Sequence, residues 1–441
     1  MSKTIIIIGA GLAGLSAALQ AAENGCNVKL VSSLPSERAQ SVMAEGGINA
    51  ALNTKDENDS PEEHFTDTIK AACGLADPNA VWGMTQAAPE LVHWLLKLGV
   101  KFNMSGYDDV DLRNFGGQKK KRTAFAQSDT GKQIMTAMID AVRRKEASGM
   151  VERFSHHSFL TLRLCGNICC GCVIRDEYSQ ETVELPGDAV IVATGGMHGL
   201  FGNTTGSLSN TGEVTAELFR LGVPLANGEM IQYHPTTVKC GGKRMLISEA
   251  ARGEGGRLFA MKDGKQWYFM EEKYPELGNL MPRDITAREI WKVSHESEVF
   301  LDMTEISEEI ISNKLSGLAD DCMTYLHKDI RKEPVSVLPG IHYFMGGILV
   351  DEQHRTPIQN LYAAGECCAQ YHGANRLGGN SLLGALYGGC VAAKSACEQA
   401  DVVDLSCATQ IDFPPASQIS EIKQLNKVMQ ETMGVVRNEN T

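Results

Sequence analysis

Short apolar runs alternate along this chain with helical stretches rich in small residues, which is the pattern of parallel strands joined by helices. Residues 4–8 form a β-branched run that predicts a strand buried on both faces. The Ala-rich stretch 15–24 predicts a helix, and residues 27–31 predict the next strand. Together these segments predict one β-α-β unit at the start of the chain.

Later apolar runs predict that distant parts of the chain complete the same sheet. Residues 189–196, A-V-I-V-A-T-G-G, repeat the junction between a strand and a glycine turn, and the pattern resumes at residues 347–350 and 361–365. Residues 222–347 are richer in charge and lack this rhythm, so they predict an inserted domain. The expected fold class is therefore α/β, a doubly wound domain of discontinuous segments with an inserted α+β domain. An amphipathic helix is expected at residues 420–433.

Length and charge exclude several classes of protein. A chain of 441 residues is too long for one core, and a net charge of −13 leaves no cationic excess for nucleic-acid binding. The apolar run near the N-terminus is far too short for a signal peptide or a membrane span. We therefore expect a cytoplasmic protein with no transmembrane segment and no nucleic-acid partner.

The thirteen cysteines are scattered, and no secretory signal precedes them, which favours free thiols in a reducing compartment. The tightest group is Cys165, Cys169, Cys170 and Cys172. Its C-x-x-C spacing leaves a metal or iron–sulfur centre as an alternative. The group lies in alternating strand-like sequence around a Gly-Asn turn, so we expect partly buried thiols and no metal site.

The motif G-A-G-L-A-G directly follows the first predicted strand and opens the predicted helix. In that context Gly9, Gly11 and Gly14 predict a dinucleotide site, because they let the backbone approach a pyrophosphate at a helix N-terminus. The acidic residue usual at the end of the second strand is absent, and Ser32 stands there. Gly46 and Gly47 permit another close approach of the backbone, which we assign to the same cofactor.

The Gly-rich segment 372–383, H-G-A-N-R-L-G-G-N-S-L-L, is the point at which the chemistry is expected to converge. It joins a predicted strand ending in A-G-E to a predicted helix, so free backbone N–H groups and a positive helix end meet there. Arg376 lies within it, and its planar guanidinium suits a carboxylate or a phosphate. Taken alone, a loop with a surface arginine is an equally good interpretation.

Four polar segments of the inserted domain predict an anion-binding site that transfers protons. They are Y-H-P-T at 233–236, S-E-A-A-R-G-E-G-G at 248–256, M-P-R-D at 281–284 and I-H-Y-F-M-G-G at 341–347. Each places His, Ser, Glu or Arg beside glycine or proline, as in loops that line a cleft. Glu249 and Arg252 are three residues apart and would share one face of a helix. A structural role remains the simpler interpretation for any single histidine.

These motifs, in this order, resemble the flavoproteins of the fumarate reductase, succinate dehydrogenase and L-aspartate oxidase family. The resemblance runs from residue 4 to about residue 400. It implies domains at 1–221 and 339–400 that bind FAD, a capping domain at 222–338, and the start of a C-terminal helical region at 401–441. The implied cofactor contacts are Gly9, Gly11, Gly14, Ser32, Gly46, Gly47, Ala193, Thr194, Gly195, Gly365, Glu366, Ser381 and Leu382.

The resemblance also implies the substrate and the catalytic residues. A C4-dicarboxylate would be bound by His234, Ser248, His342 and Arg376, and it would be protonated by Arg283. Glu249 and Arg252 match the family's proton relay. Arginine can act as an acid here only if such a relay reprotonates it and the acceptor is a strongly basic carbanion. The expected activity is FAD-dependent reduction of fumarate to succinate.

Two departures from the family pattern change these expectations. Gln40 stands where membrane-bound members carry the histidine that is bonded to the flavin, so we expect noncovalent FAD and a preference for fumarate reduction. The second departure is the short C-terminal part, which leaves the docking of an iron–sulfur or other electron-donor partner open. Through such a partner the protein would lie at the inner face of the membrane.

The alternatives are L-aspartate oxidase, the succinate dehydrogenase direction, and a noncatalytic flavin-binding protein. In L-aspartate oxidase a glutamate before the G-G of the basic loop would face the substrate ammonium, whereas this chain has Phe115. Phenylalanine offers an ammonium group no anionic partner, so fumarate is favoured as the substrate. A noncatalytic protein would have no need for the relay from Glu249 to Arg283.

Overall fold

A five-stranded parallel sheet forms the base of the molecule in the computed structural model, which describes residues 2–107, 109–401 and 419–437. Segments far apart in the chain build it, and all neighbouring strands run parallel. The strands, in spatial order, are β20 (Leu361–Ala363), β10 (Ala189–Val192), β1 (Thr4–Ile8), β2 (Asn27–Ser32) and β6 (Val151–Ser155). The predicted sheet of discontinuous segments is confirmed.

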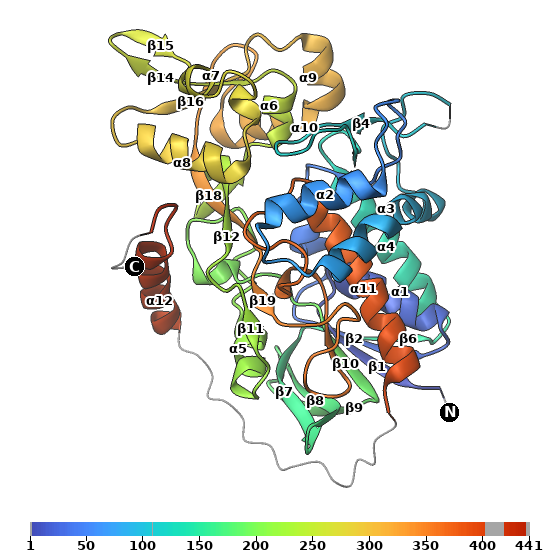
Figure 1. Cartoon of the computed structure of the whole chain (residues 1–441). Coiled ribbons are helices and arrows are strands. Elements are labelled where there is room, and N and C mark those ends of the chain that lie inside the picture. The colour runs from blue at the N-terminus through green and yellow to red at the C-terminus, as the bar shows by residue number, and fades with distance from the viewer. Residues whose placement is uncertain (1, 108, 402–418, 438–441) are drawn as a thin grey trace.

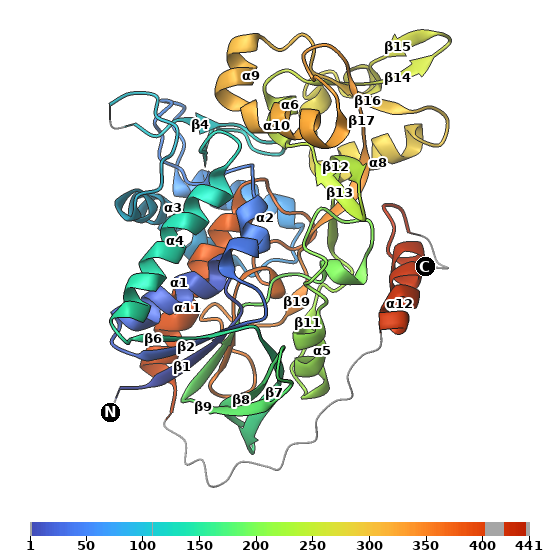
Figure 2. The same ribbon diagram turned by 180° about the vertical axis from the view of Figure 1, so that it is seen from behind.

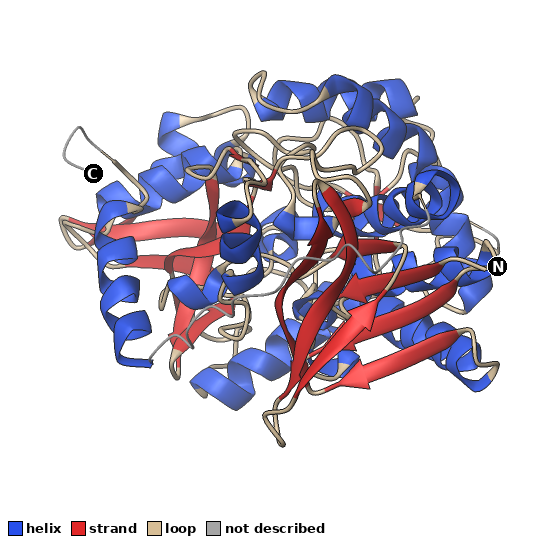
Figure 3. Ribbon diagram, turned by 90° about the horizontal axis from the view of Figure 1, so that it is seen from below, coloured by secondary structure: helices blue, strands red, loops and turns tan. Residues whose placement is uncertain are grey.

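The isoleucines of β1 divide their side chains between two hydrophobic cores. Ile5 and Ile7 pack in a core with helices, whereas Ile6 and Ile8 pack in a core with a second, antiparallel sheet. The helices are α1 (Leu12–Glu23), α3 (Pro78–Leu98), α4 (Thr130–Ala147) and α11 (Asn380–Gln399). The second sheet consists of β7 (His157–Cys165), β8 (Ile168–Asp176) and β9 (Thr182–Pro186), and Figure 3 shows it beside the parallel sheet. Helices therefore cover one face and strands cover the other.

Helices α1 and α11 pack directly against each other, although more than 350 residues separate them in the sequence (Figure 1). The close approach depends on Gly389, because a Cβ atom there would lie 2.1 Å from Oγ of Ser16 and 2.3 Å from the carbonyl oxygen of Ala13. This crossing joins the first and last segments of the parallel-sheet domain.

A separate layer with its own hydrophobic core lies at the top of the molecule in Figures 1 and 2. Its strands are β14 (Arg257–Lys262), β15 (Lys265–Trp267), β16 (Val299–Asp302) and β17 (Val335–Ser336). Its helices are α6 (Glu249–Gly253), α7 (Phe269–Lys273), α8 (Arg283–Val293), α9 (Glu308–Lys314) and α10 (Ser316–Asp321). This layer is the predicted α+β insertion, and the sheet of β12 (Ile231–Cys240), β13 (Lys243–Leu246) and β18 (Leu338–Phe344) joins it to the rest.

The remaining strands and α-helices of the described structure lie around these layers. They are β3 (Ile48–Asn49), α2 (Pro61–Ala72), β4 (Leu112–Arg113), β5 (Thr123–Ala124), α5 (Glu213–Arg220), β11 (Leu225–Ala226), β19 (Gly347–Ile348) and α12 (Ile419–Thr432). The run at 347–350 does not join the parallel sheet as expected, because β19 pairs antiparallel with β11. The predicted C-terminal helix is confirmed as α12, and residues 402–418 and 438–441 of the predicted C-terminal region lie outside the described residues. Tyr233 donates a hydrogen bond to the carbonyl of Met433 just after this helix (2.7 Å).

The cysteine group of the β7–β8 hairpin contains three free, buried thiols, those of Cys169, Cys170 and Cys172. Cys165 is disulfide-bonded, so the expectation of free thiols is wrong at that residue. Within the described ranges no cluster of His, Cys, Asp or Glu could bind a metal ion. None of the helices described here combines the length and hydrophobicity that a membrane crossing needs.

Candidate active site

One continuous cavity of about 310 Å³ brings most of the predicted site residues together. That volume lies within the range of roughly 300–1,000 Å³ that is usual for small-molecule sites. The predicted cofactor contacts line it, and so do the predicted substrate-binding and catalytic residues. The latter are Phe115, His234, Ser248, Glu249, Arg283, His342 and Arg376. Two predicted residues do not line it, Gly14 and Arg252.

The glycines before α1 leave its N-terminus open to a ligand. A Cβ at Gly9 would lie 2.2 Å from the carbonyl oxygen of Ala193, and Gly9 has a φ of +111°, a conformation that favours glycine. Gly14 packs under this turn, where a Cβ would lie 1.8 Å from the carbonyl oxygen of Gly9. Gly14 therefore serves the packing of helix on strand rather than ligand contact.

A buried polar atom in the cavity fits the ribose of a dinucleotide. The Ser32 hydroxyl oxygen is buried at the end of β2 and has no hydrogen-bond partner among the described residues. A buried hydroxyl without a partner is costly, so a ligand hydroxyl is a natural partner there. Together with the open helix N-terminus, this atom shows that the residues present fit a dinucleotide.

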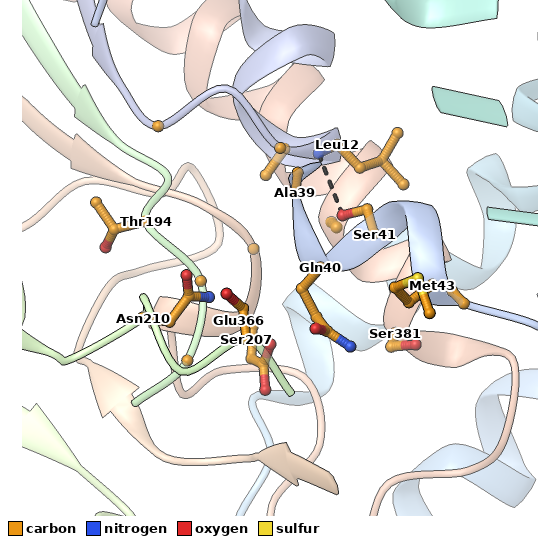
Figure 4. A pocket seen from close by; sticks show the side chains of 18 of the residues that line it. Leu12, Ala39, Gln40, Ser41, Met43, Thr194, Ser207, Asn210, Glu366 and Ser381 are labelled. Carbon is orange, nitrogen blue, oxygen red and sulfur yellow. Dashed lines mark hydrogen bonds between the residues drawn. The ribbon is translucent and has the colours of Figure 1, made fainter. Parts of the chain in front are cut away.

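Figure 4 shows how the segment before Gly46 and Gly47 borders the same cavity. Ser41 accepts a hydrogen bond from the backbone N–H of Leu12 (3.3 Å), which ties this segment to the start of α1. Gln40 extends its amide into the space between Ser207, Glu366 and Ser381. Glu366 also accepts a hydrogen bond from the N–H of Phe344 (3.1 Å), so it connects the cofactor side to β18.

The Gly-rich segment before α11 is fixed by a buried amide, that of Asn49. Its Nδ2 donates to the carbonyl of Gly378 (2.8 Å) and to Oδ1 of Asn380 (2.7 Å). Gly379 has a φ of +85°, and a Cβ there would lie 2.1 Å from Oδ1 of Asn49. A Cβ at Gly378 would lie 2.7 Å from the Phe115 ring. The segment can therefore approach the inserted layer only because it lacks side chains at these positions.

Two buried guanidinium groups meet at one oxygen atom. Arg283, the first residue of α8, donates to Oε1 of Gln232 at 3.0 Å, and Arg376 donates to the same atom at 2.9 Å. Nε of Arg376 is buried without a hydrogen-bond partner among the described residues. Burial, and then the charge of Arg283, lower the pKa of Arg376 to about 9. Such a pair of cations is arranged to receive an anion.

Glu249 connects Arg283 to Arg252, as the sequence predicted. Its Oε2 accepts from Nε and Nη2 of Arg283 at 2.8 and 2.7 Å, and its Oε1 lies 3.5 Å from Nη2 of Arg252. Burial alone would raise the pKa of Glu249, but Arg283 and Arg252 together hold it below its ordinary value. Arg252 is fully buried and donates to the carbonyl of Asn279 (2.6 Å), so it lies behind the cavity wall.

The two predicted histidines lie side by side on adjacent strands. The rings of His234 and His342 are 5.1 Å apart, and Nδ1 of His342 is 2.8 Å from the hydroxyl of Thr205. Burial, and then the charge of Arg283, hold the pKa of both histidines well below the ordinary value, so both are neutral at pH 7. Neutral imidazole N–H groups can donate hydrogen bonds to a carboxylate.

Ser248 and Phe115 complete the predicted substrate end. Ser248 is the N-cap of α6, and its hydroxyl accepts from the N–H of Ala250 (3.4 Å). Phe115 is buried, and its ring lies over the glycine turn at Gly46, where a Cβ would be 3.3 Å away. Phe115 therefore contacts the cofactor segment as well as the substrate end of the cavity.

Gln232, Tyr343 and Glu45 contribute to this site and were not among the predicted site residues. Gln232 precedes the motif Y-H-P-T and bridges the two arginines. Tyr343 places its ring 4.3 Å below the guanidinium of Arg376, a cation–π contact. Glu45 lines the cavity, and burial together with Asp321 raises its pKa to about 8. Gln232 directly precedes a predicted motif, Tyr343 lies within the segment 341–347, and Glu45 directly precedes Gly46; these positions were the only available signal.

Comparisons with known proteins agree with this arrangement. A family model described as an FAD binding domain matches residues 4–382. The succinate dehydrogenase flavoprotein subunit of Bacillus subtilis is 44% identical over 403 residues, which cover 89% of this chain and 69% of that protein. The L-aspartate oxidase of Streptomyces coelicolor is 34% identical over 406 residues, covering 89% of this chain and 68% of that protein.

Proteins named as fumarate reductases are also similar in sequence and in structure. The 8-methylmenaquinol:fumarate reductase flavoprotein subunit of Wolinella succinogenes is 33% identical over 439 residues, covering 96% of this chain and 70% of that protein. A solved structure of the quinol fumarate reductase of E. coli superposes with a TM-score of 0.88 at 28% identity. That match covers 99% of this chain and 80% of the other.

Proposed function

The chain belongs to the FAD-binding family that includes the flavoproteins of succinate dehydrogenase, fumarate reductase and L-aspartate oxidase, and on that premise we propose that it reduces fumarate, or a related unsaturated dicarboxylate. The chain is an FAD-dependent oxidoreductase. The proposal rests on one observation above all: Arg376, Arg283, Glu249 and Arg252 form a buried series in contact with the cavity.

Binding of the dicarboxylate is assigned to two groups of cavity residues, one for each carboxylate. Arg376 would grip one carboxylate, since its buried Nε lacks a partner among the described residues and its charge is little screened. The neutral His234 and His342, with Ser248, would donate hydrogen bonds to the other carboxylate. Holding both ends orients the double bond and stabilises negative charge that develops on a carboxylate.

Proton delivery is assigned to Arg283. When bound, reduced FAD would supply a hydride to one carbon of the double bond. The carbon next to it then needs a proton, and Arg283 lines the cavity. Glu249 holds two nitrogens of this guanidinium, and it can return a proton received from Arg252. Burial of the cluster excludes water as a competing acid.

Noncovalent attachment of FAD is part of the proposal. Gln40 reaches into the cavity, and its amide cannot form the bond that a histidine forms with the flavin in the membrane-bound relatives implied by the sequence resemblance. Because a covalent bond of this kind raises the flavin potential, its absence favours fumarate reduction over succinate oxidation. The similarity to the B. subtilis succinate dehydrogenase subunit favours the opposite direction, which the same residues would catalyse in reverse.

Aspartate oxidation is the second candidate, supported by the similarity to L-aspartate oxidases. It would require an anionic partner for the substrate ammonium. Phe115 occupies the predicted position, and it is apolar and buried.

The partner of the protein would be an iron–sulfur or other electron-donor protein, and the protein would lie in the cytoplasm or, through that partner, at the inner face of the membrane.

Anaerobic single-turnover assays test the proposal. Protein reduced with dithionite is mixed with fumarate or with other unsaturated dicarboxylates, and flavin reoxidation is followed by absorbance. Oxidised protein is mixed with succinate or L-aspartate, and flavin reduction is followed. Reoxidation by fumarate is expected, and the variant Arg283→Ala should lose it while keeping its FAD.

The matched control is Arg288→Ala, because Arg288 lies on the same helix with a half-exposed side chain. It should keep the wild-type rate. A wild-type protein that responds to L-aspartate and not to fumarate would overturn the substrate assignment. A substantial single-turnover rate in Arg283→Ala at full FAD occupancy would remove Arg283 from the mechanism.

A further inference from the structure

Two cysteines from the first and last segments of the parallel-sheet domain hold their sulfur atoms 2.8 Å apart. They are Cys26, between α1 and β2, and Cys397, near the end of α11. Both are free thiols in this structure. A disulfide bond has a length of about 2.05 Å, so the two sulfurs would have to move together by less than about 1 Å.

The backbone holds Cys26 at a fixed position. Helix α1 ends in a Schellman motif: Gly25 has a φ of +78°, its N–H donates to Ala22, and the N–H of Cys26 donates to Ala21. Cys26 is also 4% exposed and belongs to the core shared by α1 and α11. Its sulfur therefore has little freedom to move away from its partner.

Cys397 is fixed from the other side. It lies within the last turn of α11, where Lys3 donates from Nζ to its carbonyl oxygen (2.7 Å). Its side chain is partly exposed and packs against the core that contains Cys26. The pair is thus rigid, with the side chain of Cys397 partly exposed and that of Cys26 buried behind it.

We propose that Cys26 and Cys397 are a site of reversible oxidation, at which hydrogen peroxide converts the two thiols into a disulfide that joins the first and last segments of the parallel-sheet domain. One thiol attacks the peroxide to give a sulfenic acid and water, and the second thiol displaces a second water to form the S–S bond. Two thiols lose two electrons in total, and one peroxide is reduced to two waters. A thiol reductant restores the original pair.

The position of the bond determines its effect. It joins two residues that are 371 positions apart, and long closed loops restrict the unfolded chain most. It also fixes the crossing of α1 with α11, the two helices whose N-termini border the cavity. Oxidation should therefore stabilise the domain and slow the loss of FAD.

The rate of oxidation follows from the surroundings of the thiols. Burial, and then the neighbouring thiol of Cys26, raise the pKa of Cys397. Because the thiolate is the reactive form, the reaction should be slow at pH 7 and faster at pH 9. The pair would respond to sustained exposure to peroxide rather than to a brief pulse.

Peptide mapping of the holoprotein tests the proposal. FAD-loaded protein is incubated with dithiothreitol or hydrogen peroxide, alkylated, and digested without reduction. A linked peptide containing Cys26 and Cys397 is expected only after peroxide, with a melting temperature about 3 °C or more above that of the reduced protein. Adding dithiothreitol should reverse both changes.

Variants separate this bond from other oxidation. Cys26→Ser and Cys397→Ser should each lose the linked peptide and show a smaller rise in melting temperature than the wild type, because dithiothreitol can also reduce the disulfide at Cys165. Cys73→Ser, at an exposed thiol on the end of α2, should keep both. The wild type alone suffices if a variant does not fold: separate sulfinic acids at the two cysteines, or unmodified thiols after peroxide at pH 9, would overturn the proposal.

Discussion

Arg283 and Arg376 donate hydrogen bonds to the same atom, Oε1 of Gln232, from 3.0 and 2.9 Å. Gln232 is buried, and its Nε2 donates to the carbonyl of Arg376 (2.7 Å), so the amide orientation is fixed by its partners. One uncharged oxygen therefore holds two cations together. An anion in the cavity would supply the negative charge that Gln232 lacks.

Replacing this oxygen by a charged one should compete with the substrate. In Gln232→Glu the new carboxylate would pair with both guanidinium groups and repel a dicarboxylate. We expect kcat/KM for fumarate to fall on the order of 100-fold, about 3 kcal/mol, chiefly through a higher KM. Steady-state kinetics with a chemical electron donor measure this. Gln86→Glu, on the partly exposed surface of α3, is the control and should behave as wild type.

The second prediction concerns the grip of Arg376. Lysine at this position keeps the charge and loses the planar fork, so Arg376→Lys should weaken both substrate binding and turnover. The expected loss of transition-state stabilisation is on the order of 2–4 kcal/mol. It is measured as fumarate turnover per bound flavin. An unchanged value would mean that Arg376 does not bind the substrate.

A third prediction concerns substrate choice at Phe115. Phe115→Glu would supply a negative partner for an ammonium group and repel a carboxylate. The ratio of kcat/KM for fumarate to that for L-aspartate should fall by at least about tenfold. Phe115→Leu removes the ring without adding charge and should leave the ratio nearly unchanged. If both variants gave the same ratio, Phe115 would not face the substrate.

The fourth prediction concerns flavin attachment. Because Gln40 cannot bond covalently to FAD, acid denaturation of the purified protein should release all of the flavin into the supernatant. Absorbance of the supernatant and in-gel fluorescence of the pellet measure the two fractions. Flavin fluorescence that migrates with the polypeptide would contradict the prediction.

A fifth prediction follows from the lowered pKa of Glu249. The folded-state pKa lies below the ordinary value of 4.5, so the ionised carboxylate contributes stability that is fully present above pH 4.5. That stability is lost as the pH falls through the folded-state pKa. Glu249→Gln should therefore lower the free energy of unfolding by about 3–5 kcal/mol at pH 7. The difference from wild type should shrink below pH 4.5, which denaturant titrations at several pH values would show.

The sequence predicted the elements whose signal is local. The apolar run of β1, the glycine motif before α1 and the Gly-rich segment before α11 each carry their pattern within about ten residues. The family resemblance implied that Arg283, Glu249 and Arg376 share one site, and all three line the cavity. Their predicted catalytic roles await the experiments above.

What the sequence did not predict depends on partners far apart in the chain. Gln232 has no distinctive neighbours, and its importance comes from Arg283 and Arg376, which are 51 and 144 residues away. The sequence also did not predict that β7–β9 cover one face of the parallel sheet, because alternating apolar residues in a hairpin do not specify the surface against which they pack. Asn49 belongs to the same class, since its partners in the Gly-rich segment are more than 300 residues away.

The pairing of β20 with β10 has a consequence for folding during synthesis on the ribosome. Strands β1, β2, β6 and β10 are made early, yet the cavity also needs Arg376, Ser381 and Leu382, which emerge after the whole upper layer has been synthesised. Until β20 and α11 are synthesised, helix α1 of the nascent domain lacks its contact with α11, and one edge of strand β10 is exposed. The upper layer, with its own hydrophobic core, can fold during that interval. The FAD site is thus completed late in synthesis, and until then the free edge of β10 is a surface at which a strand of another chain could pair.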